Sequence, residues 1–325
     1  MPSAPVDLSV VVPMYNEEAV LPLLVKRLRA AADGWGVSYE VLCVDDGSTD
    51  GTPVLLQRLR REWPEVRVVR LRANAGHQAA ICAGLARARG QWVVTLDADL
   101  QDPPEVIGEM LAVAHGQGVD VVYGVRTDRS TDTHFKRVTA RAFYRTIRAM
   151  SDVDARVDAG DYRMMSRATV DAVNALPEHG RVLRLVVPAL GFPSASVNYA
   201  RAARAAGDSK YPLGKMIRLS IDSITGFSTA PLRFATWIGL VGGLAAIGVL
   251  VYAFVELLLG NTLPGWTSTV VIVAAVGAVQ LLALGILGEY VGRTYVALQA
   301  RPSYFVAHDS LDLAAGESRD GQTRT

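Results

Sequence analysis

The chain has 325 residues, enough for one large domain or two modest ones, and half of these residues are hydrophobic. Lys and Arg total 33 while Asp and Glu total 32, so the formal net charge of +1 provides no basic field for nucleic acid. The two cysteines, Cys43 and Cys82, fit no metal spacing and imply no disulfide framework, which indicates a reducing compartment.

The first 126 residues alternate between strand and helix patterns. Short runs rich in β-branched residues predict buried strands at 8–13, 39–46, 66–71, 91–98 and 120–126. Between these runs, apolar residues at helical spacing predict helices at 17–31, 51–63, 76–89 and 103–116. The alternation predicts an α/β fold whose mostly parallel sheet is covered by helices on both faces.

Four of the predicted strands end in, or lead into, residues suited to binding a ligand. The first runs into Pro13, Tyr15, Asn16 and Glu17, the second ends in Asp45 and Asp46, the third leads to Gly76, and the fourth ends in Asp97 and Asp99. Parallel sheets bind ligands beyond the carboxyl ends of their strands, so we expect these residues to meet although they are far apart in sequence. Their convergence predicts a ligand site at one rim of the sheet.

The pair Asp97 and Asp99 comes directly after a buried strand. An Asp-x-Asp motif alone often caps a helix or closes a turn, where carboxylates accept hydrogen bonds from backbone N–H groups. At the end of a buried strand, however, two neighbouring carboxylates both stay ionised only when a cation is close. Hard oxygen ligands suit Mg²⁺ or Mn²⁺, so the pair predicts a metal that also contacts substrate phosphates.

Basic side chains are expected to hold those phosphates, because the chain has neither a Walker A motif nor a G-x-G-x-x-G motif. Arg126, at the end of the fifth predicted strand, is the preferred phosphate ligand, and Lys136 and Arg141 follow it. The alternative for the basic residues beyond the strand is a solvated helix face.

Two apolar stretches lie in the C-terminal third. Residues 234–260 carry one charge, Glu256, and residues 267–288 carry none. Each exceeds the roughly 20 residues that cross a bilayer, which predicts two transmembrane helices, with two buried helices of a soluble domain as the alternative. Lys and Arg flank the outer ends of the pair and are absent from the connecting loop. This pattern predicts a cell-membrane protein whose N-terminal domain and both termini are cytoplasmic.

The segment before the first span has apolar residues at helical spacing, which predicts an amphipathic helix within residues 211–232. This helix would lie in the membrane interface or pack on the N-terminal domain, and either way Lys210 and Lys215 could approach an anionic lipid phosphate. The polar residues after 308 are expected to be disordered. The expected organisation is a domain at 1–210, this helix, a membrane hairpin at 233–300 and a tail at 301–325.

Four motifs, VVVPMYNEE, VDDGSTDGT, NAGHQAAICAGL and TLDADLQDPPE, resemble those of the inverting glycosyltransferases of family 2. The likeness continues through DAGDYRMMSR and both apolar stretches, over roughly residues 7 to 300. Over this length the chain resembles the polyisoprenyl-phosphate glycosyltransferases related to dolichol-phosphate mannose synthase. This resemblance implies a nucleotide-sugar-binding, Rossmann-like domain of GT-A type with a mostly parallel sheet. It also implies the transfer of a hexose from a UDP- or GDP-sugar to a polyprenyl phosphate in the lipid bilayer.

The resemblance further implies roles for individual residues. The base and ribose of the donor would be held by Pro13, Tyr15, Glu17, and Asp45 or Asp46, with Asn16 and Gly76 in the same nucleotide site. Asp97 would lie near the ribose or the donor sugar, Asp99 would bind the metal, and Gln101 would lie beside the diphosphate. Asp158 and Asp161 would orient the acceptor or contact the sugar, and a turn around the glycine between them is the alternative.

Two other functions stay open at the level of sequence. The protein could transfer the sugar to another lipid acceptor, or it could bind nucleotide sugars at the membrane without turnover. Carboxylates suited to a metal argue against the second, because a scaffold has no need of them. The sugar, the nucleotide and the choice of Mg²⁺ or Mn²⁺ are also open, and small residues such as Gly242 and Gly243 would permit the close helix packing of a homo-oligomer.

Overall fold

The computed structural model describes residues 5–127, 159–177, 181–200, 230–259, 265–299 and 301–311. The chain divides into two compact units. The first holds Met1–Val138, Val153–Ser209 and Pro302–Thr325, and the second holds Thr139–Asp152 and Lys210–Arg301. The C-terminal segment therefore belongs to the same unit as the N-terminal domain.

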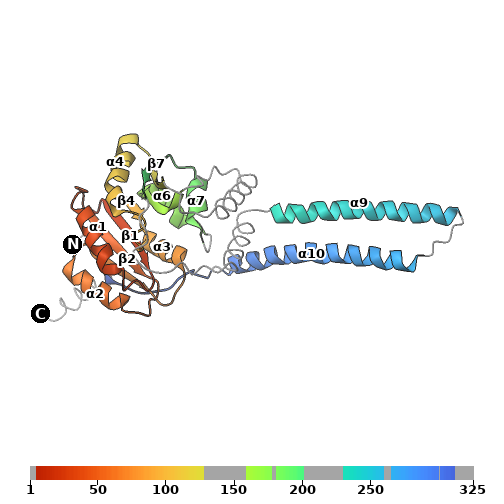
Figure 1. The fold of residues 1–325 in the computed structure, drawn as a ribbon, viewed down its shortest axis with the longest axis horizontal. Helices are drawn as coiled ribbons and strands as arrows, with labels where there is room; N and C mark the ends of the chain where they lie inside the picture. The colour runs from red at the N-terminus through yellow and green to blue at the C-terminus, as the bar shows by residue number, and fades with distance from the viewer. Residues whose placement is uncertain are drawn as a thin grey trace. The chain divides into compact units, whose positions relative to one another are not determined.

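An eight-stranded sheet forms the centre of the first unit, in the order β7-β5-β6-β4-β1-β2-β3-β8. Figure 1 labels β7, β4, β1 and β2 of this sheet. Its strands are β1 (Leu8–Met14), β2 (Tyr39–Asp45), β3 (Val66–Leu71), β4 (Trp92–Thr95), β5 (Val121–Arg126), β6 (Ala159–Ser166), β7 (Ser194–Tyr199) and β8 (Val306–Asp309). β1 pairs in parallel with β2 and β4, β2 with β3, and β5 with β7. β6 is antiparallel to β4 and β5, and β8 is antiparallel to β3. The sheet is mixed but mostly parallel, which confirms the predicted α/β fold.

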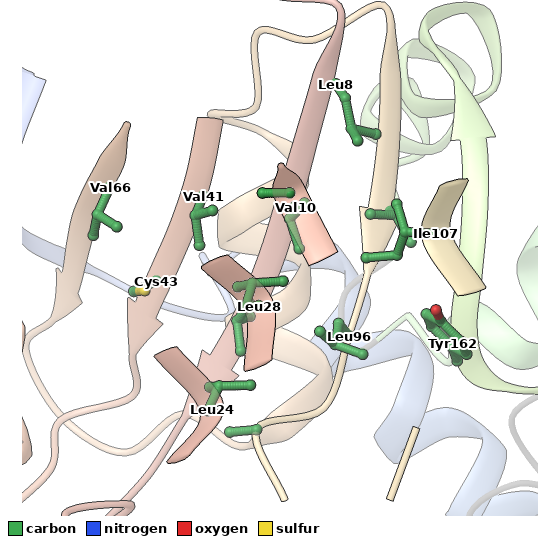
Figure 2. Close-up of a cluster of buried hydrophobic side chains, with 14 of the residues drawn as sticks. Leu8, Val10, Leu24, Leu28, Val41, Cys43, Val66, Leu96, Ile107 and Tyr162 are labelled. Atoms are coloured by element: carbon green, nitrogen blue, oxygen red, sulfur yellow. The ribbon is translucent and has the colours of Figure 1, made fainter. Parts of the chain in front are cut away.

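Helices cover both faces of this sheet. One face carries α1 (Leu21–Ala32), α2 (Thr52–Glu62) and α4 (Ile107–Gln117), and the other carries α3 (His77–Leu85), α6 (Arg167–Ala175) and α7 (Leu183–Ala189). On the first face, Leu24 and Leu28 of α1 pack with Val10 and Val41 of the sheet (Figure 2). Successive side chains of a strand point to opposite faces of the sheet, so Val10 of β1 belongs to the core on one face and Val11 to the core on the other. Each fully buried Leu contributes about 2 kcal/mol, so both layers hold the strands in register.

β6 extends the sheet beyond the five strands that the sequence predicted. Its register with β4 places Trp92 opposite Ser166 and Thr95 opposite Arg163. The strand reads AGDYRMMS and contains Arg163, which is 1% exposed, so it lacks the apolar alternation by which strands are recognised. Because β6 lies between β4 and β5, it brings Asp161 to the strand that precedes Asp97 and Asp99.

β8 completes one edge of the sheet with residues from the C-terminal segment. Its register with β3 places Asp309 opposite Val69 and His308 opposite Arg70. Arg67 Nε donates a hydrogen bond of 2.9 Å to Asp309 Oδ1, and Ser310 Oγ accepts one of 3.0 Å from the Val68 N–H. Asp309 and Ser310 are both buried, so the expectation of disorder after residue 308 is wrong for these two residues.

The second unit contains two long helices, α9 (Ala230–Leu258) and α10 (Trp266–Leu298), which pack along each other (Figure 1). Within the part of the chain that the structure describes, one segment, Ala275–Val296, is long and apolar enough to cross a membrane, and Ala235–Ala245 is a shorter apolar helix. One candidate span is therefore present, and the second span stays a prediction. The predicted amphipathic helix falls almost entirely outside the described residues.

Candidate active site

The loops that follow β1 and β2 are joined at the rim where both strands end. The parallel register pairs Met14 with Asp45, so the residues after them emerge together. Asn16 has a φ of 56°, its N–H donates to Ser48 Oγ at 3.0 Å, and its Oδ1 accepts from the Thr49 N–H at 2.8 Å. The Glu17 N–H donates to Thr52 Oγ1 at 2.9 Å. The side chain of Asn16 and the backbone of Glu17 thus shape the loop from which Tyr15 is exposed.

Asp45 and Asp46 lie at the end of β2 and are buried. Asp45 Oδ1 accepts a hydrogen bond from the Ser48 N–H at 2.8 Å, and its Oδ2 lies 3.3 Å from Arg70 Nε of β3. Asp46 accepts from two backbone N–H groups of the next rim loop, Ala75 at 2.7 Å and Gly76 at 2.9 Å. Asp46 therefore fixes the loop that begins α3, while Asp45 is braced by a cation.

Gly76 begins α3 with a φ of 96°, a conformation that favours glycine. No atom lies within 4 Å of the place where a Cβ would stand, so the requirement comes from the backbone angle. The next residue is His77, whose Nε2 lies 3.4 Å from Asp97 Oδ1 and 3.6 Å from Asp161 Oδ2. The start of α3 thereby places a histidine between two carboxylates from different strands.

Asp97 follows β4 and keeps a third of its side chain exposed, at 33%. Burial raises the pKa of Asp97 to about 6; His77 opposes this rise, whereas the charges of Asp102, Asp161 and Asp99 add to it. Negative charge is therefore concentrated around Asp97 at the rim. A bound cation would relieve this repulsion.

Asp161, in β6, is surrounded by donors. Its Oδ2 accepts from Gln78 Nε2 at 3.0 Å and lies 3.6 Å from Arg184 Nη2, and its Oδ1 lies 3.2 Å from Arg163 Nη2. Burial opposes ionisation, but the hydrogen bond with His77 and the charges of Arg163, Arg184 and His77 outweigh it and hold the pKa of Asp161 well below its usual value. Asp161 is therefore ionised and firmly held.

His77 lies between two acidic neighbours that favour its protonated form. Burial disfavours the imidazolium, but the hydrogen bond with Asp161 and the charges of Asp97 and Asp161 outweigh that effect and raise the pKa of His77. The sequence interpretation missed His77 and Arg184. His77 could have been found, because it directly follows Gly76 at the rim, whereas Arg184 on α7 is brought to the site only by the tertiary fold.

Asp99 and Gln101 lie in the tight loop after Asp97. The Gln101 N–H donates to Asp99 Oδ1 at 3.1 Å, and Leu100 between them has a φ of 61°, rare for a residue with a side chain. Among the described residues no group of three His, Cys, Asp or Glu is arranged as a metal site. The donor set that fits Mg²⁺ or Mn²⁺ is the carboxylate pair of Asp97 and Asp99, since such ions take few protein ligands and complete their shell with phosphate oxygens and water.

Arg126 ends β5 and is held by two neighbours. Its Nε donates to the Tyr199 hydroxyl at 3.3 Å, and its Nη2 lies 3.6 Å from Asp102 Oδ1. Its side chain remains 30% exposed. Five other residues predicted for the site lie outside the described part of the chain: Lys136, Arg141, Asp158, Lys210 and Lys215.

Comparison with known proteins gives consistent matches. A family model described as Glycosyl transferase family 2 matches residues 9–173. The uncharacterized glycosyltransferase YkcC of Bacillus subtilis (strain 168) is 41% identical over 302 residues, covering 93% of each chain. The bactoprenol glucosyl transferase of Shigella phage SfV is 37% identical over 305 residues, covering 93% of this chain and 98% of its own. A crystal structure of glucosyl-3-phosphoglycerate synthase from Mycobacterium tuberculosis superimposes with a TM-score of 0.49 at 24% identity, covering 67% of this chain and 76% of that one.

Proposed function

This chain belongs to glycosyl transferase family 2, and on that basis we propose that it transfers a hexose from a nucleotide sugar to a polyprenyl phosphate. The proposed donor is UDP- or GDP-linked, and the proposed product is a polyprenyl-monophosphate sugar. A relative named bactoprenol glucosyl transferase, which this chain matches over 93% of its length, supports a lipid phosphate as acceptor and glucose as the first sugar to test.

The observation that carries this proposal is the pairing of opposite charges at one rim. Asp97 and Asp99, which follow β4, provide oxygen donors for a divalent cation. Arg126 presents a partly exposed guanidinium at the end of β5, which lies two strands away from β4 in the sheet. A reaction between a nucleoside-diphosphate sugar and a lipid phosphate must hold two anions together, and such a rim supplies both kinds of counter-charge.

The donor would bind where β1 and β2 end. Asp45, braced by Arg70, is the proposed carboxylate for the base or ribose, together with Pro13, Tyr15, Asn16 and Glu17. Asp46 and Gly76 shape the adjacent loop. We assign Asp99, with Asp97, to Mg²⁺ or Mn²⁺ and place Gln101 beside the diphosphate. The ion would neutralise charge on the nucleoside diphosphate as it leaves.

The acceptor reacts as an anion. An oxygen of the lipid phosphate forms a bond to C1 of the sugar while the bond from C1 to the diphosphate oxygen breaks, and in-line attack inverts the configuration. A monoester phosphate has a second pKa near 6, so its oxygen is largely ionised at neutral pH and needs no strong general base. Arg126 would hold this phosphate, and Asp161 would orient His77 and Arg184 around the reacting groups.

The proposed pair of membrane crossings is supported by the return of the chain to its own sheet. β7 and β8 belong to one sheet, so the chain between them must leave and re-enter the same side of a bilayer and therefore cross it an even number of times. If α10 crosses once, a second crossing is needed, and α9 provides it with 29 helical residues, about 44 Å for a core of about 30 Å. Exposed Leu240, Phe254 and Leu281 on the two helices suit lipid contact. The basic residues that flank the helix pair in the sequence support a cytoplasmic location for the first unit.

A transfer assay on the full-length protein in lipid tests the proposal. Polyprenyl phosphate, a panel of labelled UDP- and GDP-sugars and Mg²⁺ or Mn²⁺ would be supplied to the wild type and to Asp99→Asn. We expect metal-dependent label in the lipid phase from one donor, reduced at least a hundredfold in the variant. Competition by diacylglycerol would distinguish transfer to that lipid from transfer to polyprenyl phosphate. Intact nucleotide-sugar binding without transfer to any lipid would contradict the proposed reaction.

A further inference from the structure

We infer that Tyr199 and Asp102 are positioning residues that hold the Arg126 guanidinium for the acceptor phosphate, an inference that rests on the proposed function. Asp102 lies in the loop that also carries Asp97 and Asp99, and Tyr199 ends β7. Neither is part of the predicted nucleotide or metal set. Together they link three segments at the place where Arg126 leaves the sheet.

The hydrogen bonds run in one direction through this group. Arg126 Nε donates to the Tyr199 hydroxyl at 3.3 Å, and that hydroxyl donates to Asp102 Oδ1 at 2.5 Å. Burial and the neighbouring Asp102 raise the pKa of Tyr199, so the phenol keeps the proton that it donates. Asp102 is 2% exposed, which leaves its carboxylate committed to Tyr199 and to the guanidinium 3.6 Å away.

The ring of Tyr199 is itself fixed by close packing. It meets Tyr162 edge to face, with ring centroids 5.5 Å apart. Both rings lie against Gly124, where a Cβ would come within 2.7 Å of Tyr162 Cδ1 and 3.0 Å of Tyr199 Cε1. The Tyr162 hydroxyl donates to the Pro103 carbonyl at 2.8 Å rather than to Arg126. The two tyrosines thus share one packing site but have different polar partners.

This arrangement explains how an arginine at the open rim keeps a single orientation. Nε and Nη2 of the guanidinium lie against Tyr199 and Asp102, and the side chain keeps 30% of its surface exposed. A guanidinium that is already held loses less conformational freedom when it binds a phosphate. Because Asp102 lies three residues after Asp99, the same loop sets the distance between the proposed metal and the proposed phosphate ligand.

The test replaces one hydroxyl and keeps the ring. For Tyr199→Phe we expect the KM for polyprenyl phosphate to rise roughly tenfold, the KM for the nucleotide sugar to stay unchanged and kcat to change less than about twofold. Tyr162→Phe is the matched control, since it removes the other hydroxyl of the same ring pair without touching Arg126. In an Arg126→Ala background, Tyr199→Phe should have no further effect on the acceptor KM.

Three outcomes would overturn the inference: an unchanged acceptor KM in Tyr199→Phe, an equal rise in Tyr162→Phe, or an undiminished effect in the Arg126→Ala background. A thermal-unfolding cycle on Tyr199→Phe and Arg126→Ala gives a readout that does not depend on the acceptor. Non-additive melting temperatures support the coupling, and additive ones contradict it. Absence of transfer by the wild type would instead refute the proposed function.

Discussion

Asp161 joins the parts of the candidate site that are farthest apart in sequence. Its carboxylate meets Gln78 of α3, Arg163 of its own strand and Arg184 of α7. Gln78 in turn accepts a hydrogen bond of 3.1 Å from the Leu183 N–H at the start of α7. One charged group therefore links α3 and α7 to β6.

Replacing Asp161 by Asn should lower kcat about a hundredfold, because the amide removes the charge that orients His77 and Arg184, and misplaced groups at a reacting centre cost about that much. The measurement is turnover at saturating donor and acceptor, with circular dichroism to confirm folding. Asp171→Asn is the control, since this carboxylate lies on α6 and is 63% exposed. Full turnover in Asp161→Asn would remove Asp161 from the reaction.

For single residues, sequence reasoning rested on one rule of parallel sheets. It grouped Asp45, Asp97 and Asp99 because strands that run in one direction end at one rim. The same rule covers His77, which was overlooked because isolated histidines show no ligand spacing. It could not place Arg184 beside Asp161, since that contact depends on an antiparallel strand and a helix packed from far along the chain.

Among the secondary-structure elements, β8 is attached through a buried ion pair. Asp309 accepts from Arg67 and also lies 3.3 Å from Arg87 Nε, and its side chain is 2% exposed. Without the Asp309 charge, the buried Arg67 would keep one carboxylate, Glu40 at 3.7 Å, and breaking a buried pair of this kind costs about 3 kcal/mol. The short strand is therefore anchored more firmly than its four residues suggest.

Asp309→Asn should lower the melting temperature of the first unit by roughly 6–12 °C, as expected for a loss of about 3 kcal/mol in a unit of this size. Thermal unfolding in detergent measures it. Glu62→Gln serves as comparison, because Glu62 forms an exposed pair with Arg58 at 2.7 Å, and such pairs contribute at most about 1 kcal/mol. Equal shifts for both variants would show that β8 does not depend on this charge.

The same carboxylate predicts a dependence on pH. Burial opposes its ionisation, but the Arg67 and Leu311 hydrogen bonds and the charges of Arg67 and Arg87 outweigh this and lower the pKa of Asp309. A carboxyl group whose pKa is lowered by folding stabilises the folded state fully at a pH above its pKa in the unfolded chain, which is near 4. This stabilisation is lost as the pH falls through the lower pKa of the folded state. The difference in melting temperature between wild type and Asp309→Asn should be constant from about pH 5 to 8 and shrink below about pH 4. A difference that persisted undiminished at pH 3 would contradict this.

The elements differ in how far sequence could predict them. β1 to β5 are short, β-branched and bounded by polar loops, so their local pattern is sufficient. The apolar pattern of β6 is interrupted by Asp161 and Arg163. β8 has only four residues, and Asp309 within it is held by a hydrogen bond from Arg67 of β3. Pairing across more than two hundred residues has no local signature.

For the molecule as a whole, the return of the chain to its own sheet constrains the membrane topology. The connection between α9 and α10 and the residues before β8 should lie on opposite sides of the bilayer. Thiol labelling can show this, because Cys43 is buried with its pKa raised to about 12, and burial also raises the pKa of Cys82.

In intact cells a membrane-impermeant maleimide should modify Thr262→Cys but not Ser303→Cys, and it should modify both after lysis. The basic residues that flank the helix pair favour this orientation. The unsubstituted protein provides the background for Cys43 and Cys82. Equal labelling of both positions before lysis would show that α9 and α10 do not form a transmembrane hairpin.

The position of β8 in the chain also determines when the protein can finish folding. β3 is synthesised more than two hundred residues before its partner, and the two hydrophobic helices leave the ribosome in between. Until β8 is made, the backbone N–H and C=O groups on the outer edge of β3 have no partner strand. Sheets with such an open edge tend to associate with other chains. On the proposed topology, α9 and α10 would enter the bilayer before β8 closes the sheet, so membrane insertion and completion of the fold would be successive steps of one assembly.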